Sequence, residues 1–363
     1  MKKILTIIGA RPQFIKAAAV SHAIRKNFAN LIEEDILHTG QHYDREMSEQ
    51  FFEELDIPRP RFNLGVGSGS HAVQTAAMLT GIEEVLTANA YDGVLVYGDT
   101  NSTLAGALTA AKLHIPVYHV EAGLRSFNRA MPEEINRIVA DHTASLLFAP
   151  TETAMKNLRN EGFDNKRIVM SGDVMLDIAL SLGPAAREHN DILDKLGLRE
   201  NNYILATVHR DFNTDNPERL TAIIKALQHI ALETPVVLPL HPRTAKALSA
   251  TGLDADGNGL KVIPPASLTE MLTLEQCSKM VITDSGGVQK EAFFFKRPCI
   301  ILRPETEWTE ITDHGAALLT DADPDKITEA YKHYSNSTAE FPNLFGDGHA
   351  AEHILKAISS YKF

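Results

Sequence analysis

The chain contains 363 residues, of which 47 are acidic and 35 are lysine or arginine, giving a formal net charge of −12. Nucleic acids and anionic membranes are bound through basic surfaces, so this balance argues against both as partners. No apolar run approaches the roughly 20 residues that span a bilayer. The opening MKKILTIIG turns to glycine, arginine and proline too early for a secretory signal. We therefore expect a cytoplasmic protein with two domains.

Short runs rich in valine, isoleucine and leucine alternate with longer amphipathic segments along the whole chain. This alternation is typical of β-α units and a parallel sheet. The first set of predicted strands covers residues 4–9, 34–40, 93–99, 116–123, 146–150 and 167–173. The second set covers residues 203–209, 235–242, 260–265, 279–287, 297–303 and 315–320.

The predicted fold class is α/β, with two Rossmann-like domains. We expect a first domain over residues 1–185, a second over residues 186–345, and a C-terminal helix over residues 346–363 that packs back on the first domain. Open parallel sheets bind ligands at the carboxyl ends of their strands. Polar residues that follow the predicted strands are therefore the candidates for function.

The segment VITDSGGVQKEAFFF, residues 281–295, predicts an anion site at the start of a helix. Ser285 can cap the first free backbone N–H groups, and Gly286 and Gly287 let a phosphate approach the same groups. Glu291 lies one turn further on, where its carboxylate can accept bonds from two ribose hydroxyls. The alternative interpretation is an ordinary capped core helix with a surface glutamate.

A second strand-to-helix turn, IIGARPQFIK, carries two cations, Arg11 and Lys16. It lacks the further glycines of a dinucleotide-binding fingerprint. Arg11 at the end of a strand is well placed for a phosphate or carboxylate. The alternative is a tight turn with a solvated arginine.

Four acidic residues follow strands or open helices of the first set: Asp99, Glu121, Glu133 and Glu134. Carboxylates that converge at one sheet edge repel one another and raise at least one pKa, as acid–base chemistry requires. Structural alternatives exist, namely a helix cap from Asp99, a pair of Glu121 with Arg125, and a pair of Glu134 with Arg137.

In the second set, His209 and Arg210 follow one strand, and His241 and Arg243 follow the next. Histidine can supply a titratable or cationic donor near a leaving phosphate, and arginine a fixed charge.

Metal binding is the competing interpretation of the histidines, and HTGQH, with His38 and His42, is its best case. A strand end separates these two imidazoles, and Cys277 and Cys299 show no paired metal spacing. We expect neither a metal nor a cofactor.

Together the motifs resemble the non-hydrolysing UDP-N-acetylglucosamine 2-epimerases over nearly the whole chain. The matching segments are GARPQFIK, HTGQH, GDTNSTLAGALTAAK, HVEAGLRS, PEEINR, DSGGVQKEA and FGDGHAAEHI. The resemblance implies a GT-B-like fold in which two Rossmann-like domains face a central cleft. It also implies a homodimer that serves polysaccharide biosynthesis.

By this similarity, the catalytic positions are Asp99, Glu121, Glu133 and His209. The implied substrate-binding residues are Arg11, Ser285, Gly286, Gly287 and Glu291, with Lys16, Arg210, His241, Arg243 and Arg303 as further candidates. The implied reaction eliminates UDP across C1–C2 of a UDP-sugar, gives a 2-acetamidoglucal, and adds UDP back with the C2 proton on the other face. The assignment of base and acid among the carboxylates stays open.

The chain departs from the family in two segments. RPETEWTE replaces the common RDTTERPE, so Trp308 stands where a family arginine contacts the phosphates, while Arg303 remains. The loop LGVGSGSHAVQT lacks the arginine that helps bind a second, activating UDP-sugar in some bacterial members, so we do not expect that activation. With VQKEAFFF, these departures resemble the branch acting on UDP-2,3-diacetamido-2,3-dideoxy-glucuronic acid. UDP-GlcNAc is the competing substrate.

Other functions fit parts of the pattern. A GT-B glycosyltransferase would share the nucleotide site but needs an acceptor site and not this set of acids. A hydrolysing epimerase would release UDP and free N-acetylmannosamine, and a UDP-sugar sensor would bind without turnover.

Overall fold

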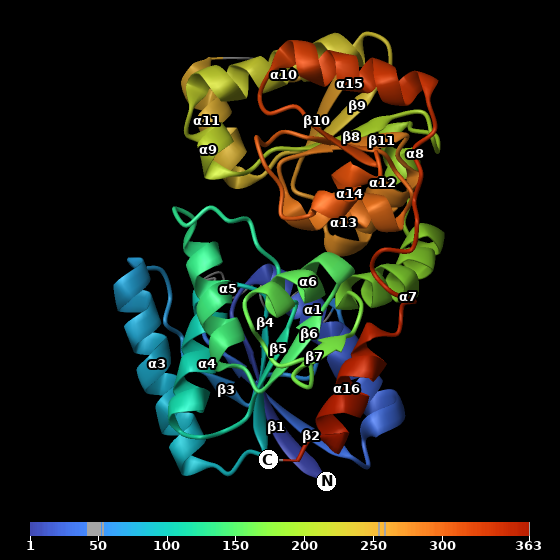
Figure 1. Cartoon of the computed structure of the whole chain (residues 1–363). Helices are drawn as coiled ribbons and strands as arrows, with labels where there is room; N and C mark the ends of the chain where they lie inside the picture. The colour runs from blue at the N-terminus through green and yellow to red at the C-terminus, as the bar shows by residue number, and fades with distance from the viewer. Residues whose placement is uncertain (42–51, 53, 253–254, 258, 363) are drawn as a thin grey trace. The chain divides into compact units, whose positions relative to one another are not determined.

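The structure is a computed structural model that describes residues 1–41, 52, 54–252, 255–257 and 259–362. The chain forms two compact units (Figure 1). Unit 1 comprises Met1–Ile178 and Asn343–Phe363, and unit 2 comprises Ala179–Pro342.

Unit 1 is built on a parallel sheet whose described strands follow the order β3-β2-β1-β4-β5-β6-β7. The strands are β1 (Lys2–Ile8), β2 (Ile32–His38), β3 (Phe62–Asn63), β4 (Gly93–Tyr97), β5 (Val117–Val120), β6 (Leu146–Ala149) and β7 (Ile168–Met170). All except the two-residue β3 were predicted from their apolar runs. Strands of this kind are buried on both faces, as in β4, where every residue is buried.

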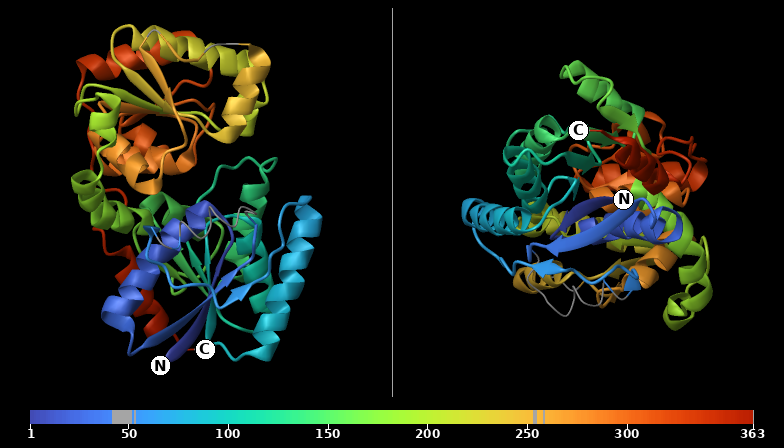
Figure 2. Two further views of the ribbon diagram at one scale, coloured as in Figure 1. Left: turned by 180° about the vertical axis from the view of Figure 1, so that it is seen from behind. Right: turned by 90° about the horizontal axis from the view of Figure 1, so that it is seen from below.

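Helices cover both faces of the unit 1 sheet (Figure 2). They are α1 (Arg11–Ala23), the π-helix η1 (Ile24–Phe28), α3 (His71–Ala88), α4 (Asn101–Lys112), α5 (Pro132–Thr143), α6 (Glu152–Asn160), α16 (Ala350–Ser360) and the first part of α7 (Val174–His189). Helices α1 and α16 lie side by side on one face, and α3, α4 and α5 lie on the other. The C-terminal helix is therefore part of unit 1, and Lys2 Nζ donates to the Ile358 carbonyl at 2.8 Å.

Unit 2 repeats this plan with a parallel sheet in the order β10-β9-β8-β11-β12-β13. Its strands are β8 (Ile204–Thr207), β9 (Val236–Pro239), β10 (Leu260–Ile263), β11 (Met280–Thr283), β12 (Cys299–Ile301) and β13 (Ala317–Leu319). These are the six runs predicted from the sequence.

The helices of unit 2 enclose its sheet. They are α8 (Ile192–Leu196), α9 (Asp211–Thr214), α10 (Pro217–Ala231), α11 (Pro242–Thr251), α12 (Leu268–Cys277), α13 (Gly286–Phe294), α14 (Thr309–Asp313) and α15 (Pro324–Asn336). Helix α10 presents Leu220, Ile223 and Leu227 to a fully buried cluster that includes Ile204 of β8 and Ile327 of α15.

Both sheets have the strand order of the Rossmann fold, which confirms the predicted α/β class with two Rossmann-like units. The chain reverses direction across each sheet between its first and fourth strands in chain order, β1 and β4 in unit 1 and β8 and β11 in unit 2. Ligands of such sheets bind at the carboxyl ends of the strands at this switch point. Among the described helices, none is both long and apolar enough to span a membrane.

Candidate active site

At the switch point of unit 1, one buried amide joins the turn after β1 to the end of β4. Gln13 Oε1 accepts bonds from the backbone N–H groups of Gly9, at 2.8 Å, and Ala10, at 3.1 Å. Its Nε2 donates to the Tyr97 carbonyl at 2.9 Å and to Thr103 Oγ1 at 3.0 Å. Because Gln13 is 1% exposed, these bonds form away from water and fix the turn from which α1 starts. Arg11 is the first residue of that helix.

Lys16 of α1 and Glu121 after β5 form a buried ion pair. Nζ lies 2.5 Å from Oε1, and the two side chains are 8% and 9% exposed. Glu121 has a φ of +70°, a left-handed conformation that is uncommon for a residue other than glycine. Gly98 borders the pair, since a Cβ at Gly98 would lie 3.1 Å from Nζ and 3.4 Å from Oε1. The pair therefore lies beside the turn that carries Asp99.

Asp99 is held from α5. Its carboxylate forms an ion pair with Arg137, and its backbone carbonyl accepts a bond from Asn136 Nδ2 at 2.9 Å. The helix cap considered for Asp99 is made instead by Thr100, whose side chain accepts from the Thr103 N–H. The Asp99 side chain is 28% exposed, so it is both oriented and accessible to a ligand.

The two glutamates at the start of α5 differ in their surroundings. Glu134 is 1% exposed and accepts bonds from the backbone N–H groups of Ser126 and Phe127, each at 3.0 Å. The structural alternative considered for Glu134, a pair with Arg137, is formed at 3.1 Å. Glu133 is partly exposed and makes no hydrogen bond or ion pair within the described part of the chain. Glu134 is thus a structural anchor, whereas Glu133 is available for a ligand.

A fully buried ionic cluster, which the sequence reasoning missed, lies behind these turns. His119 Nδ1 is 2.7 Å from Asp141 Oδ1, and Arg125 Nη1 is 2.8 Å from Asp141 Oδ2. Burial opposes ionisation of Asp141, but the interactions with His119 and Arg125 outweigh it and lower the pKa of this carboxyl. The pair of Glu121 with Arg125 considered above is not formed, because Arg125 also binds Glu161 through two bonds of 2.7 Å.

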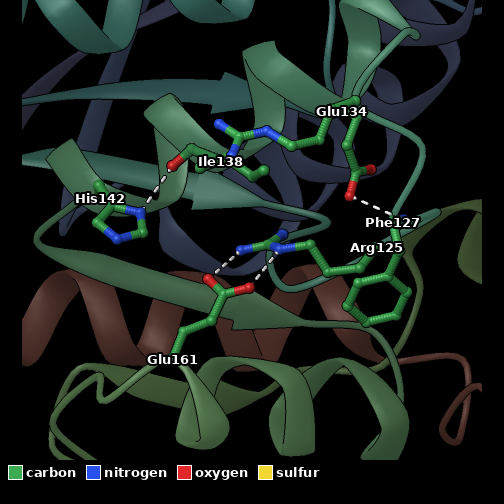
Figure 3. A pocket seen from close by; sticks show the side chains of 7 residues that line it. Arg125, Phe127, Glu134, Ile138, His142 and Glu161 are labelled. Carbon is green, nitrogen blue, oxygen red and sulfur yellow. Dashed lines mark hydrogen bonds and ion pairs between the residues drawn. The ribbon is translucent and has the colours of Figure 1, made fainter.

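Arg125 and Glu161 border an open hollow of about 350 Å³ in unit 1 (Figure 3). The remaining lining residues are Phe127, Arg129, Glu134, Ile138 and His142. The Phe127 ring is largely exposed, and its backbone has a φ of +59°.

At the switch point of unit 2, Asp284 has the role that Gln13 has in unit 1. Its buried carboxylate accepts bonds from the backbone N–H groups of His209, at 3.1 Å, and Arg210, at 3.0 Å. Asn213 Nδ2 donates to it at 3.1 Å. The turn after β8 is thereby tied to the end of β11. Arg210 Nε is buried and has no hydrogen-bond partner among the described residues, so this turn presents a donor that a ligand can use.

Ser285 caps α13 as predicted from the sequence pattern, with its side chain accepting from the Val288 N–H. A Cβ on Gly286 would lie 2.6 Å from Glu307 Oε1, whereas one on Gly287 would meet only Ser285 Oγ, at 3.8 Å. Glu307 also lies 3.0 Å from Arg303. The helix start thus has a carboxylate beside Gly286 and open space beside Gly287. Glu291 lies on the same helix.

Trp308 is 3% exposed and packs near the start of α13. Lys290 Nζ lies 4.3 Å from the centre of its ring, and the lysine is 1% exposed. A cation over a desolvated indole is stabilised by the ring quadrupole. Lys290 of α13 thus lies beside the residue that stands in place of the family arginine.

His209 and His241 have their rings 5.8 Å apart. His241 also caps α11, because its Nδ1 accepts from the Arg243 N–H at 3.2 Å. Arg243 forms an exposed pair with Asp215 at 2.6 Å, so its charge is partly balanced within the protein. The structure thus brings His209, Arg210 and His241 together around the ends of β8 and β9.

Among the described residues, no group of three or more histidine, cysteine, aspartate or glutamate side chains has the arrangement of a metal site. His42, the partner considered for His38, lies outside the described residues. Cys277 and Cys299 are buried free thiols.

The two units are Rossmann-like, with acids at the switch point of unit 1 and a serine-capped helix start at that of unit 2. This arrangement is that of an enzyme of the GT-B-like class. A family model described as UDP-N-acetylglucosamine 2-epimerase matches residues 25–359. The chain belongs to this family.

Relatives and solved structures agree. The chain is 49% identical to the UDP-2,3-diacetamido-2,3-dideoxy-D-glucuronate 2-epimerase of Pseudomonas aeruginosa, covering 98% of this chain and 99% of the relative. It is also 49% identical to a UDP-N-acetylglucosamine 2-epimerase homolog of Methanococcus maripaludis, with the same coverage. The crystal structure of the Methanocaldococcus jannaschii UDP-GlcNAc 2-epimerase with UDP-GlcNAc and UDP has a TM-score of 0.90 and 41% identity, and covers 98% of this chain and 99% of that chain. These findings confirm the GT-B-like fold and the UDP-sugar 2-epimerase activity predicted from the sequence.

Proposed function

We propose that the enzyme inverts C2 of a UDP-2-acetamido sugar by anti elimination and re-addition of UDP through a 2-acetamidoglucal. The observation that carries this proposal is the ion pair of Lys16 with Glu121 beside the Asp99 turn. A carboxylate in contact with an ammonium stays ionised and can accept a proton, and the ammonium stabilises the negative charge that develops nearby.

In the first step, a carboxylate takes the C2 proton, the C1–O bond breaks, and its electron pair leaves with UDP. In the second step, UDP adds to C1 again, and a proton reaches the other face of C2. Asp99, Glu121 and Glu133 are the proposed proton carriers, because each is ionisable and positioned at the edge of one sheet. The sum of the two steps is an isomerisation that consumes no cofactor.

Unit 2 holds the groups proposed to bind UDP. Ser285 and Gly287 present the start of α13 to the diphosphate, and Arg210 has a buried donor without a partner in the described chain. His209 is the proposed donor to the departing diphosphate, and Glu291 the proposed ribose contact. Supporting this view, the Methanocaldococcus jannaschii relative was crystallised with UDP-GlcNAc and UDP.

Arg11, His241, Arg243 and Arg303 complete the proposed substrate contacts. Two of these arginines already form ion pairs with carboxylates of the protein. Arg303 lies 3.0 Å from Glu307, and Arg243 pairs with Asp215, so both must exchange a protein carboxylate for a ligand oxygen.

The preferred substrate is proposed to be UDP-2,3-diacetamido-2,3-dideoxy-glucuronic acid. The identity of 49% to the Pseudomonas aeruginosa enzyme, against 40% to the UDP-N-acetylglucosamine 2-epimerase of Methanocaldococcus jannaschii, supports this choice. The segments VQKEAFFF and TEW, which resemble the branch acting on the diacetamido acid, support it as well. The test is the kcat/KM of the purified enzyme for each UDP-sugar, with no acceptor and no activator present. A higher value for the diacetamido acid supports the proposal, and an equal or higher value for UDP-GlcNAc overturns it. Release of free 2-epimerised sugar and UDP would indicate a hydrolysing enzyme.

We also propose that the enzyme is a cytoplasmic homodimer in polysaccharide biosynthesis. Two buried free thiols suit a reducing compartment. Helix α3 exposes an apolar side chain, Val73, at 67%, together with the small residues Ala72, Ala76 and Ala77, and such a face suits contact with a second copy. Sedimentation of the wild type and of Val73→Glu tests this, since only the wild type should sediment as a dimer.

A further inference from the structure

His119 is completely buried and lies between two acceptors. Its Nδ1 is 2.7 Å from Asp141 Oδ1, and its Nε2 is 2.7 Å from the Gly98 carbonyl oxygen. Neither the ionised carboxylate nor the carbonyl can donate a hydrogen. With Asp141 ionised, both ring nitrogens are placed to donate, which is the hydrogen-bonding pattern of an imidazolium.

The two bonds of His119 reach the two turns that carry proposed catalytic acids. Gly98 immediately precedes Asp99 and has a φ of +64°. Asp141 accepts, through Oδ2, a bond from the backbone N–H of Gly123 at 3.1 Å, in the turn that begins with Glu121. The cation and its carboxylate thus connect the turn after β4 with the turn after β5.

We propose that His119 is a positioning residue for epimerisation: by donating from both ring nitrogens, to Asp141 and to the Gly98 carbonyl, it fixes that carbonyl and so the orientation of Asp99 relative to Glu121. This inference rests on the proposed roles of those two acids. His119 itself is 0% exposed and does not reach a substrate.

Charge balance supports the assignment. The charged groups of this cluster and of the two turns are Asp141, Arg125, Glu161, Lys16, Glu121 and Asp99 with its partner Arg137. Arg125 neutralises Glu161, and Lys16 neutralises Glu121, while Arg137 is bonded to both Asp99 and Glu134. Asp141 lies between His119 and Arg125. The net charge of these groups therefore accommodates one further positive charge on the His119 ring.

Two substitutions separate the two bonds of the ring. Asparagine places its amide nitrogen near the Nδ1 position, so His119→Asn keeps a donor to Asp141 and loses the bond to Gly98. Glutamine reaches the Nε2 position, so His119→Gln keeps the donor to Gly98. A displacement of catalytic groups by about 1 Å can cost roughly 10²-fold in rate. We expect His119→Asn to lower kcat at least about tenfold while UDP affinity stays unchanged, and His119→Gln to retain kcat within a few-fold.

The comparison of kcat with thermal stability and UDP affinity decides the role. Equal losses of kcat in both variants, in proportion to their loss of Tm, would show a merely structural histidine and overturn the proposal. If neither variant folds, ¹⁵N NMR of the wild-type histidines provides the test. Two protonated ring nitrogens on His119 at pH 8 support the imidazolium, and the pyridine-type nitrogen signal of a neutral ring overturns it. This NMR result does not depend on turnover, so it remains informative even if the proposed epimerisation is absent.

Discussion

Lys16 Nζ and Glu121 Oε1 lie 2.5 Å apart at the edge of the unit 1 sheet, and both side chains are less than a tenth exposed. The contact joins the first helix of the unit to the turn after β5, two elements that are 105 residues apart in the chain. A buried ion pair of this kind contributes little to stability by itself. Removing one of its two partners is costly, because the other charge is then buried without a counterion.

The first prediction concerns the rate. Glu121→Gln keeps an oxygen that can accept from Lys16 but loses the basic carboxylate, so we expect a fall in kcat of roughly 10²-fold or more with a near-native fold. Asp99→Asn should behave in the same way. Glu83→Gln, at an exposed position on α3, is the matched control and should leave kcat unchanged. Near-normal turnover in both site variants would remove these two acids from the mechanism.

The second prediction concerns stability. Lys16→Met leaves the Glu121 carboxylate buried without its cation, and we expect a loss of about 3–5 kcal/mol in the free energy of unfolding. In the double variant Lys16→Met with Glu121→Gln, no charge is left unpaired, so stability should partly return although activity does not. Urea denaturation of the four proteins in this cycle measures the coupling. Additive losses would mean that the two side chains do not interact in solution.

The third prediction separates nucleotide binding from folding. A methyl group on Gly287 would meet only Ser285 Oγ, at 3.8 Å, so Gly287→Ala should keep the Tm of the wild type. The same methyl would obstruct a phosphate at the start of α13, and UDP affinity measured by calorimetry should fall at least about tenfold, or ~1.4 kcal/mol. Gly69→Ala, whose methyl would also meet its nearest neighbour at 3.8 Å, is the control. Unchanged UDP affinity in Gly287→Ala would place the diphosphate elsewhere.

The fourth prediction concerns pH. Burial raises the pKa of Glu34, although hydroxyl bonds from Ser21 and Thr6 partly oppose the shift. A raised pKa in the folded state means that this group stabilises the fold below its unfolded pKa of about 4.3 and that this contribution is lost as pH rises through the folded value. Glu34→Gln should therefore raise Tm at pH 7–8, with a smaller gain near pH 4.5.

The control for the fourth prediction is Glu33→Gln on the same strand. The Glu33 side chain is 43% exposed and pairs with Lys3 at 3.0 Å, so its replacement should change stability by less than about 1 kcal/mol. A loss of Tm in Glu34→Gln at neutral pH would show that the ionised carboxylate is the preferred form in the fold.

The sequence predicted the sheets well, because buried parallel strands are short apolar runs that local composition identifies. β3 was missed because a strand of two residues is too short to show an apolar run or an alternation of polar and apolar residues. The acids and the capped start of α13 were found because they follow strands directly. The partners of these acids were harder to predict, because residues such as Lys16 and Glu121 are brought together only by the crossover connections of the fold.

Gln13, Asp284 and the cluster around His119 were missed for a different reason. They act through backbone groups, and those bonds depend on neighbouring turns that sequence spacing does not reveal. One signal was present: a histidine within the apolar run VYHV must find polar partners once the strand is buried.

The most direct test of the central claim is the hydrogen at C2 during turnover in deuterated water. The enzyme is incubated with UDP-2,3-diacetamido-2,3-dideoxy-glucuronic acid, and in parallel with UDP-GlcNAc, and the 2-epimer is examined by NMR and mass spectrometry. Because elimination removes the C2 proton and re-addition returns one from solvent-exchanged carboxylates, the product should carry deuterium at C2. An epimer that fully retains its original C2 hydrogen would contradict the elimination mechanism, and no epimer from either UDP-sugar would contradict the proposed substrates.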